Sequence, residues 1–127
     1  MGKVHNVIVP TNVNPYPERF EVEAASIIAK YMGADATFLA RDTAKTPDIV
    51  IENIEWEIKS PLGKSKHTIE EQVKRASAQS LYIIIDARRC KLHMAKIRNH
   101  LKFQVSVRPK IKRVLLINKR DGVEIIK

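Results

Sequence analysis

The chain has 127 residues, 44% of them hydrophobic, which is enough for one hydrophobic core and too few for two ordinary domains. Its single cysteine, Cys90, excludes an internal disulfide and any cysteine-rich zinc site. The net charge of +9 is unevenly spread, because acidic residues outnumber basic ones 9 to 6 over residues 1–63, whereas basic residues outnumber acidic ones 17 to 5 over residues 64–127. A basic half of this kind favours a nucleic acid as partner over a merely solubilising surface.

The predicted elements begin with a short apolar run at residues 4–9, typical of an edge strand or an ordered tail, and a turn-rich loop follows it. Pro17 suits the first position of a helix and Gly33 suits a left-handed helix stop. With the apolar spacing between them, these residues predict a helix over Pro17–Met32. A strand is predicted next, over Asp35–Ala40, with a polar loop after it.

The polar loop ends at Lys45, and the stretch that follows it, TPDIVIENIEWEIKSP at residues 46–61, predicts a β-hairpin. With Asn53 and Ile54 as a two-residue turn, Asp48 is expected to face Lys59, and Val50 to face Glu57. Side chains alternate along a strand, so one face of the hairpin is charged and the other is apolar. The charged face would hold Asp48, Val50, Glu52, Glu55, Glu57 and Lys59, and the apolar face Ile49, Ile51, Trp56 and Ile58.

The second half of the chain predicts two helices and three strands. A capping box of Thr68 and Glu71 opens the first helix, and the apolar run Leu81–Asp86 is typical of a strand buried on both faces. A third helix is predicted over Lys91–Phe103, and a hairpin around Asp121 closes the chain. The elements predict one domain with a mixed α/β fold, a central sheet flanked by helices in the order α-β-β-β-α-β, then a helix and a hairpin.

Three side chains on the charged face of the hairpin and one backbone carbonyl are candidates for the site of a metal-dependent hydrolase. Asp48 and Glu57 can bind one hard divalent cation, Mg²⁺ or Mn²⁺, and the carbonyl of Ile58 can supply a third oxygen. Lys59 would lie beside the activated water, an arrangement that suits hydrolysis of a phosphodiester. The alternative is a solvated strand face on which Asp48 and Lys59 form an ordinary surface ion pair.

Glu21 is the predicted supporting acid, because it borders the apolar stripe of the first helix, where a carboxylate needs a cation or a metal. Glu23, on a neighbouring face, is the reserve candidate. The alternative for Glu21 is a surface glutamate stabilised by the helix N-terminus.

Basic residues after the hairpin are candidates for contact with a phosphate backbone. Lys64 and Lys66 follow it directly, and Arg88 follows the apolar strand; each can equally be a solvated surface residue. His93 and His100 lie two turns apart on the third predicted helix. One of them can act as a general base on a 2′-hydroxyl, or both can be surface or phosphate-contacting residues. Aromatic residues make up only 6% of the chain, which favours recognition of backbone and shape over base stacking.

The dipeptide PD at residues 47–48, followed by EIK at residues 57–59, resembles the signature of the PD-(D/E)XK nuclease superfamily. Its sequence context makes the resemblance more specific. The segments EVEAASIIAKYMGADATFLA, TPDIVIENIEWEIKSPLG and EEQVKRASAQSLYIIID together are similar to the C-terminal tRNA-nuclease toxin domains of contact-dependent growth inhibition proteins. This resemblance covers Glu18 to Asp86.

The resemblance implies a restriction-endonuclease-like core and a metal-dependent nuclease with Asp48, Glu57 and Lys59 as catalytic residues. It makes RNA, specifically tRNA, the favoured substrate, and a cognate inhibitor protein a candidate partner. It also implies that Gln72 and Gln79 contact nucleic acid, because the second helix of such toxins flanks the active site. Without the resemblance, the pattern favours surface positions for both glutamines.

Two other functions stay open. One is a DNA endonuclease of the same fold, and the other is a non-catalytic basic module that binds nucleic acid or protein. A chelator separates the second from a nuclease, because only metal-dependent cleavage stops. No apolar stretch reaches the length of a membrane span or a signal peptide, so we expect a soluble protein that acts in the cytoplasm, with no membrane partner. A toxin fragment cut from a larger secreted protein would look the same.

Overall fold

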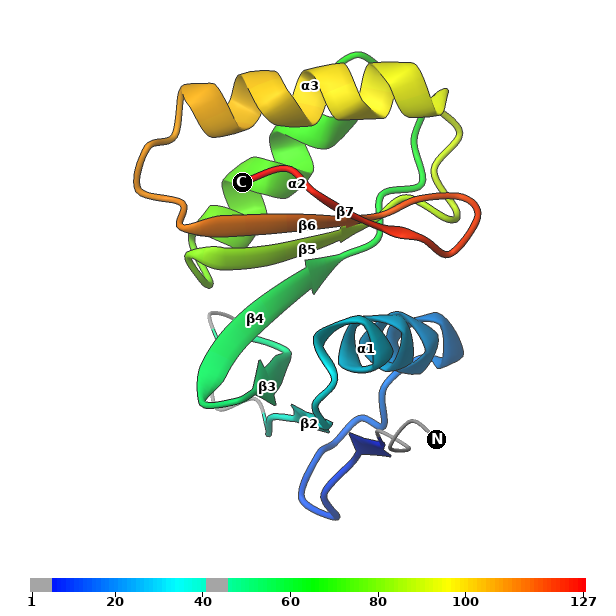
Figure 1. Ribbon diagram of the computed structural model, residues 1–127, viewed down its shortest axis with the longest axis vertical. Helices are drawn as coiled ribbons and strands as arrows, with labels where there is room; N and C mark the ends of the chain where they lie inside the picture. Colours follow the sequence, from blue (N-terminus) through cyan, green and yellow to red (C-terminus); the bar gives the residue numbers. More distant parts are fainter. Residues whose placement is uncertain (1–5, 41–45) are drawn as a thin grey trace.

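The computed structural model describes residues 6–40 and 46–127, which form a curled seven-stranded sheet with three helices (Figure 1). The strands are β1 (Val7–Ile8), β2 (Ala36–Phe38), β3 (Ile49–Ile51), β4 (Ile54–Lys59), β5 (Tyr82–Asp86), β6 (Arg113–Ile117) and β7 (Val123–Ile125). The helices are α1 (Arg19–Met32), α2 (Thr68–Ser77) and α3 (Met94–Ser106). The predicted mixed α/β fold is confirmed. Residues 4 and 5 of the predicted edge strand and the loop expected through Lys45 lie outside the described residues.

The strands lie side by side in chain order, from β1 to β7. The pairs β1–β2, β4–β5 and β5–β6 are parallel, and the other neighbours are antiparallel. Parallel neighbours need a crossover connection, and the helices α1, α2 and α3 supply the three that this sheet requires.

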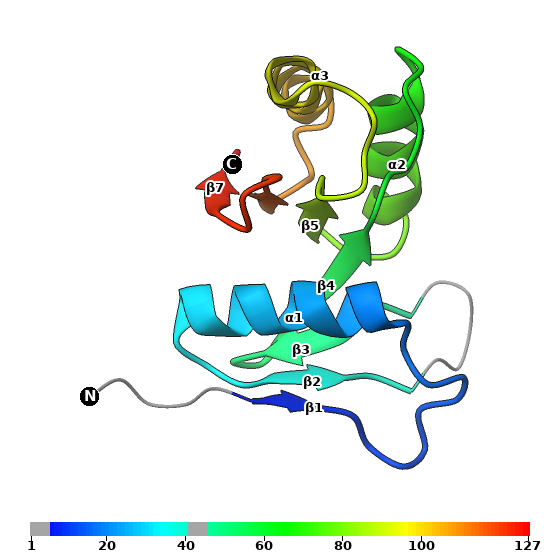
Figure 2. The same cartoon turned by 90° about the vertical axis from the view of Figure 1, so that its right-hand side faces the viewer.

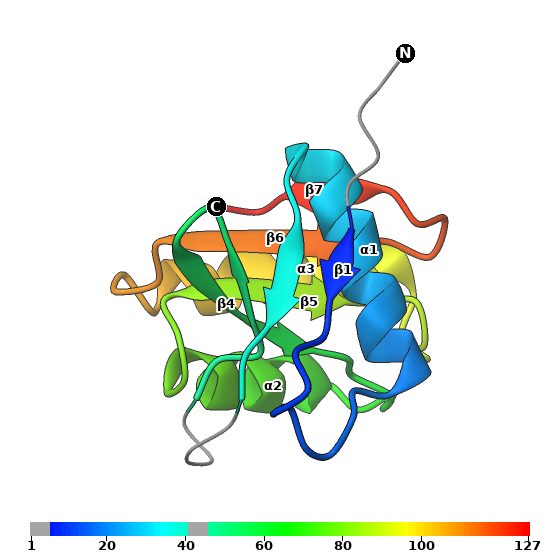
Figure 3. The same ribbon diagram turned by 90° about the horizontal axis from the view of Figure 1, so that it is seen from below.

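Helices cover both faces of the sheet, which curls around α1 so that β1–β3 and β5–β7 lie on opposite sides of that helix (Figure 2). On the other face, α2 and α3 pack against β5 and β6 (Figure 3). Strand β5 serves both cores, because Ile84 packs with α1 whereas Ile83 and Ile85 pack with α2 and α3. The prediction of a strand buried on both faces is therefore confirmed. Among the described residues, no helix combines the length and the apolar character needed to span a membrane.

Helix α1 begins two residues later than predicted, because Glu18 is its N-cap and Pro17 precedes the cap. The Glu18 N–H donates to Oε1 of Glu21 at 3.0 Å, and the two glutamates form a reciprocal capping box. Gly33 ends the helix with φ 68°, the left-handed stop that the sequence predicted.

The hairpin turn lies at Glu52 and Asn53, one residue earlier than predicted. Both residues have positive φ, 50° and 68°, as a two-residue turn between twisted antiparallel strands requires. The predicted position of Ile54 in the turn was wrong, because a β-branched residue disfavours positive φ and instead pairs with Ile51 in the ladder.

The earlier turn shifts the register, so the predicted pairs Asp48–Lys59 and Val50–Glu57 were wrong. Val50 pairs with Glu55, and the same register places Asp48 opposite Glu57. The observed pairing differs from the predicted pairing by two residues, so every side chain of the strands lies on the face that was predicted for it. The observed register thus brings the carboxyl groups of Asp48 and Glu57 closer together than the predicted register would.

Two further helix starts differ from the prediction. Thr68 is the first residue of α2 and His67 is its N-cap, without a side-chain capping bond, so the predicted capping box does not form. Helix α3 begins at Met94, three residues after Lys91, because the preceding segment buries Leu92 in the core between α2, α3 and the sheet.

Candidate active site

Two carboxyl groups meet in the interior of the protein where β3 and β4 pair. Asp48 is 3% exposed and Glu57 is 1% exposed. The backbone N–H of Ile58 donates to Oδ2 of Asp48 at 2.8 Å and fixes that carboxyl group against β4. The alternative of a solvated strand face with a surface Asp48–Lys59 pair was therefore wrong.

The environment of Glu57 opposes its ionisation. Its pKa is raised to about 8, first because burial disfavours the charged carboxylate and second because the Asp48 carboxyl group repels it. Lys59 acts in the opposite direction, with Nζ 3.0 Å from Oε2 of Glu57. The other oxygen, Oε1, is buried and receives no hydrogen bond from the described residues. Of the two buried carboxyl groups, Glu57 is the one that Lys59 contacts.

This donor set fits a hard divalent cation, which would neutralise both carboxylates. The N–H and C=O of a strand residue point to the same side, so the carbonyl of Ile58 lies on the side of β4 that faces Asp48. Among the described residues there is no cluster of three or more His, Cys, Asp or Glu side chains. A cation held by Asp48, Glu57 and Ile58 would complete its shell with water or substrate, as Mg²⁺ usually does.

A cavity of about 120 Å³ brings Glu21 and Asp48 to one site. Residues 13–18, before α1, form one wall of the cavity, and Phe38 and Leu39 at the end of β2 form another. Glu21 is half-buried, and its carboxylate also accepts the capping hydrogen bond from Glu18. Glu21 therefore lines the same cavity as Asp48 and also caps its own helix, and its role as a supporting acid stays a prediction.

The reserve candidate Glu23 lies outside this cavity and is exposed. Its carboxylate is 4.0 Å from Nη1 of Arg88 and 4.0 Å from Nε of Arg19. Glu23 therefore belongs to a surface ion-pair group and does not join Asp48.

Two features of the site were missed by sequence reasoning. Ser60 follows Lys59, and its Oγ is buried without a hydrogen-bond partner among the described residues; in the sequence it marks only the end of a strand. The loop before α1 has the sequence of a plain connection, and no periodic pattern signals that it lines the cavity. Trp56 packs on the opposite face against Tyr82, with ring centroids 5.4 Å apart. Of the two carboxyl groups, only that of Asp48 belongs to a residue that lines the cavity.

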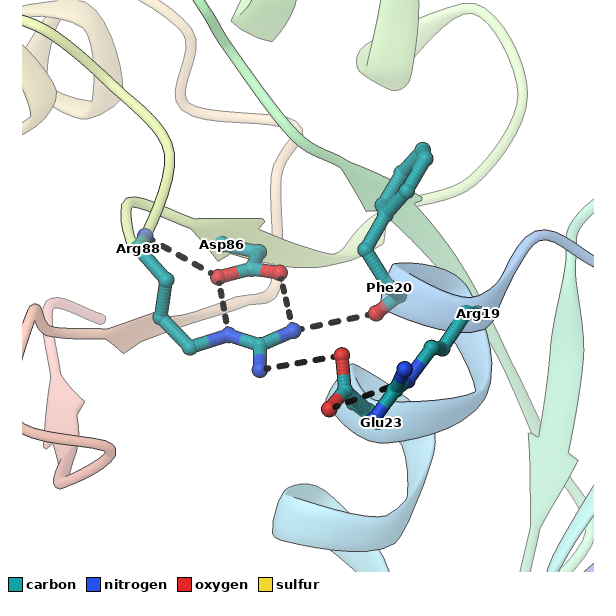
Figure 4. Close-up of polar contacts among 5 residues, drawn as sticks. All are labelled: Arg19, Phe20, Glu23, Asp86 and Arg88. Carbon is teal, nitrogen blue, oxygen red and sulfur yellow. Dashed lines mark hydrogen bonds and ion pairs between the residues drawn. The ribbon is translucent and has the colours of Figure 1, made fainter.

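Arg88 is engaged inside the protein. Its guanidinium donates to Oδ1 and Oδ2 of Asp86 at 2.9 and 2.8 Å, and to the carbonyl of Phe20 at 3.0 Å (Figure 4). Asp86 is fully buried, and the Arg88 side chain is 16% exposed. Arg88 thus holds the end of β5 to α1, and the predicted contact with nucleic acid stays a prediction.

The other predicted nucleic-acid contacts lie on the β4–α2 connection and on α2. Lys64 and Lys66 are exposed in the connection that leaves Lys59. Gln72 is half-buried on α2, whereas Gln79 lies beyond the helix end, in a turn where its N–H donates to the carbonyl of Ala76 at 2.9 Å. The two glutamines therefore do not share a helix face as predicted.

Comparison with known proteins adds two findings. The family model described as the contact-dependent growth inhibition CdiA C-terminal domain matches residues 45–123, which include Asp48, Glu57 and Lys59. A solved structure, the CdiA-CT/CdiI toxin and immunity complex from Burkholderia pseudomallei, contains a chain of similar fold, with a TM-score of 0.63 and 18% sequence identity over 96% of this chain and 98% of that one. Curated proteins gave no match.

Proposed function

The chain belongs to the family of CdiA C-terminal domains of contact-dependent growth inhibition, and on that basis we propose that it is a toxic effector acting as a metal-dependent ribonuclease. The observation that carries the proposal is the buried pair of Asp48 and Glu57, with Nζ of Lys59 3.0 Å from Oε2 of Glu57. A buried like-charge pair is costly for stability, and such pairs concentrate at sites where their chemistry is used. We further propose that the sheet around this pair is a restriction-endonuclease-like core of the PD-(D/E)XK type.

The three residues divide the work of phosphodiester hydrolysis. Asp48, Glu57 and the carbonyl of Ile58 would hold Mg²⁺ or Mn²⁺, which supplies Lewis acidity toward the phosphodiester and makes water acidic enough to lose a proton near neutral pH. Lys59, held by Glu57, positions the attacking water and offsets negative charge on the non-bridging oxygens of the transition state. Glu21 faces the same cavity as Asp48 and assists by orienting or deprotonating that water.

We propose RNA, and tRNA in particular, as the substrate. The basic second half of the chain supplies the cations that a phosphate backbone requires, and Lys64 and Lys66 are exposed directly after the catalytic strand. Gln72 and Gln79 are proposed as further contacts near the same connection. The choice of tRNA over DNA rests on the resemblance to tRNA-nuclease toxins.

Family membership also supports a proposal about partner and delivery. The similar Burkholderia chain was solved as a toxin and immunity complex. We propose that a cognate inhibitor protein binds this domain, and that the domain reaches the cytoplasm of a target cell as part of a larger secreted protein.

Gel assays of tRNA, duplex DNA and single-stranded DNA, each with magnesium or with chelator, test the function. We expect wild-type protein to cleave tRNA with magnesium only, and Lys59→Ala to lose cleavage. Lys30→Ala is the matched control, because Lys30 is an exposed lysine in the last turn of α1, at the opposite end of that helix from Glu21. It should cleave as the wild type does.

Three outcomes would change the proposal. Cleavage of DNA alone would replace RNA by DNA as the substrate. Full activity of Lys59→Ala would contradict the mechanism. RNA binding without cleavage under any metal condition would favour a non-catalytic module.

A further inference from the structure

A second groove lies between the N-terminal end of α2 and the middle of α3, on the face of the sheet opposite α1. Its volume is about 290 Å³. We call it the α2–α3 groove, and its lining residues are Lys66, His67, Glu70, His100, Phe103 and Gln104. It shares no lining residue with the cavity at Asp48.

Two polar groups in the α2–α3 groove have no partner in the part of the chain that the structure describes. Gln104 is only 6% exposed as a residue and forms no side-chain hydrogen bond with the described residues, and its amide atoms are not fully buried. Nδ1 of His100, one turn earlier on α3, is buried and also unpaired. A buried ring nitrogen without a partner costs free energy, and the unpaired amide of Gln104 beside it can both donate and accept. The groove therefore suits a ligand with both hydrogen-bond donors and acceptors.

The rest of the groove combines an aromatic ring with positive charge. Phe103 is 61% exposed, so much of its ring is open to a partner. Lys66 is exposed on the other side of the groove, and His67 lies beside it, 3.9 Å from Glu70. A flat ring, a hydrogen-bonding amide and an ammonium group match the three parts of a nucleotide, namely its base face, base edge and phosphate.

We propose that the α2–α3 groove binds one unpaired nucleotide of the RNA substrate, with the base stacked on Phe103, its edge bonded to Gln104, and a phosphate near Lys66. A paired base cannot enter, because its edge is occupied and its faces are stacked in the helix. The inference rests on the proposed ribonuclease function and deepens it by assigning a substrate contact away from the reacting phosphodiester.

The connection from β4 to α2 joins this groove to the catalytic strand. Lys66 follows Lys59 by seven residues, so the two ammonium groups belong to segments separated by at most roughly 25 Å of chain. A single RNA molecule can therefore contact both. Sequence reasoning missed the groove, because its residues come from two helices and the chain has few aromatic residues.

Binding can be measured separately from cleavage. Fluorescence anisotropy in chelator would give the Kd of a short labelled single-stranded RNA and of the duplex that it forms with its complement. For Phe103→Ala we expect the Kd of the single strand to rise about tenfold, the effect of losing one stacked base, with little change for the duplex. Tyr31→Ala, which removes an exposed aromatic ring from α1, is the matched control and should bind as the wild type does.

Gln104→Leu separates a binding role from a structural one. Leucine replaces an unpaired amide by an apolar group of similar size at a position that is only 6% exposed, so the melting temperature should change little. The Kd of the single strand should nevertheless rise severalfold. In wild-type protein, the NMR signals of the Gln104 side-chain amide should shift when the single strand is added.

The inference is overturned if both variants bind the single strand as the wild type does, or if the Gln104 amide signals do not move. Equal weakening for single strand and duplex would also overturn it, because a general loss of affinity is not recognition of an unpaired base. Absence of cleavage with intact single-strand binding would contradict the proposed ribonuclease alone, whereas cleavage with unaltered binding by the variants would contradict this groove alone.

Discussion

The guanidinium of Arg88 binds both carboxylate oxygens of Asp86, its neighbour two residues earlier, at 2.9 and 2.8 Å. The same guanidinium reaches the carbonyl of Phe20 on α1, so one side chain joins the end of β5 to the first turn of the helix that carries Glu21 (Figure 4). Helix α1 is thus positioned by an ion pair outside the candidate site.

Arg88→Ala should destabilise the protein by about 3 kcal/mol, because it leaves the fully buried Asp86 carboxylate without its partner. Arg89→Ala is the matched control. Its guanidinium lies 3.6 Å from the ring centroid of Phe20 and is exposed, so its loss should cost about 1 kcal/mol or less. Urea unfolding followed by circular dichroism measures both. Equal effects would show that the Asp86 pair contributes little.

Glu57→Gln should make the protein more stable at alkaline pH while abolishing cleavage. The pKa of Glu57 is about 8 in the folded protein, against 4.5 for an ordinary glutamate, so the folded state holds a proton that the unfolded state releases. In chelator, wild-type stability should therefore fall from about pH 4.5 to pH 8, by at most about 1.4 kcal/mol per pH unit. Melting curves across this range should show a smaller decline for Glu57→Gln. A parallel decline in both proteins would contradict the assignment.

Asp48→Asn should lose metal binding and at least about a hundredfold in cleavage rate, by analogy with removal of a single charge-stabilising group from an active site. Isothermal titration with Mg²⁺ or Mn²⁺ and a tRNA gel assay give the two readouts. Asp35→Asn is the control, because the Asp35 carboxylate accepts the N–H of Asn6 at 2.8 Å and lies outside the cavity. Metal binding that survives Asp48→Asn would rule out the proposed ligand set.

Glu21→Gln tests whether the charge of Glu21 is used in catalysis. Glutamine at this helix position retains the oxygen that accepts the Glu18 N–H, so the melting temperature should change little. Cleavage should fall at least about tenfold if the carboxylate assists the attacking water. Glu21→Ala should lose both stability and activity. Normal cleavage by the glutamine variant would leave Glu21 as a capping residue only.

The ionised carboxylate of Glu124 should stabilise the folded protein, and this stabilisation should be lost at acidic pH. Its hydrogen bonds from Arg98, at 2.7 and 2.8 Å, lower the pKa of Glu124 to about 2. A lowered pKa gives stability that is present above about pH 4.5 and is lost as the pH falls through 2. Glu124→Gln should therefore melt below the wild type at pH 7, with a difference that shrinks toward pH 2. A constant difference would mean that the ionised carboxylate is not its source.

The sequence predicted elements better than boundaries. Helix and strand periodicity located α1 and β5, and Gly33 marked the end of α1, because these signals are local. The starts of α2 and α3 were misplaced, since the Thr68–Glu71 pattern imitates a capping box, and the segment before α3 is held by burial of Leu92. The resemblance to contact-dependent growth inhibition toxins is confirmed by the family match.

The residues that share one face of the hairpin were predicted correctly, whereas their pairing across the strands and their burial were not. Alternation placed Asp48, Glu57 and Lys59 on one face correctly, because a register shift of two residues conserves faces. The burial of Asp48 and Glu57 was not predicted, since it depends on the curling of the sheet and on the packing of distant segments. Arg88 was predicted as a phosphate contact because the sequence shows neither the burial of Asp86 nor the approach of the Phe20 carbonyl.

The turn at Glu52 and Asn53 sets the register that places Asp48 opposite Glu57. Both residues are solvent-exposed and bind nothing in the cavity, yet their left-handed backbone decides which carboxylate stands across from which. A search for loss-of-function changes restricted to the neighbourhood of the charged groups would overlook them. Changes at a loop tip can therefore disturb the candidate site while the side chains of Asp48, Glu57 and Lys59 are all unchanged.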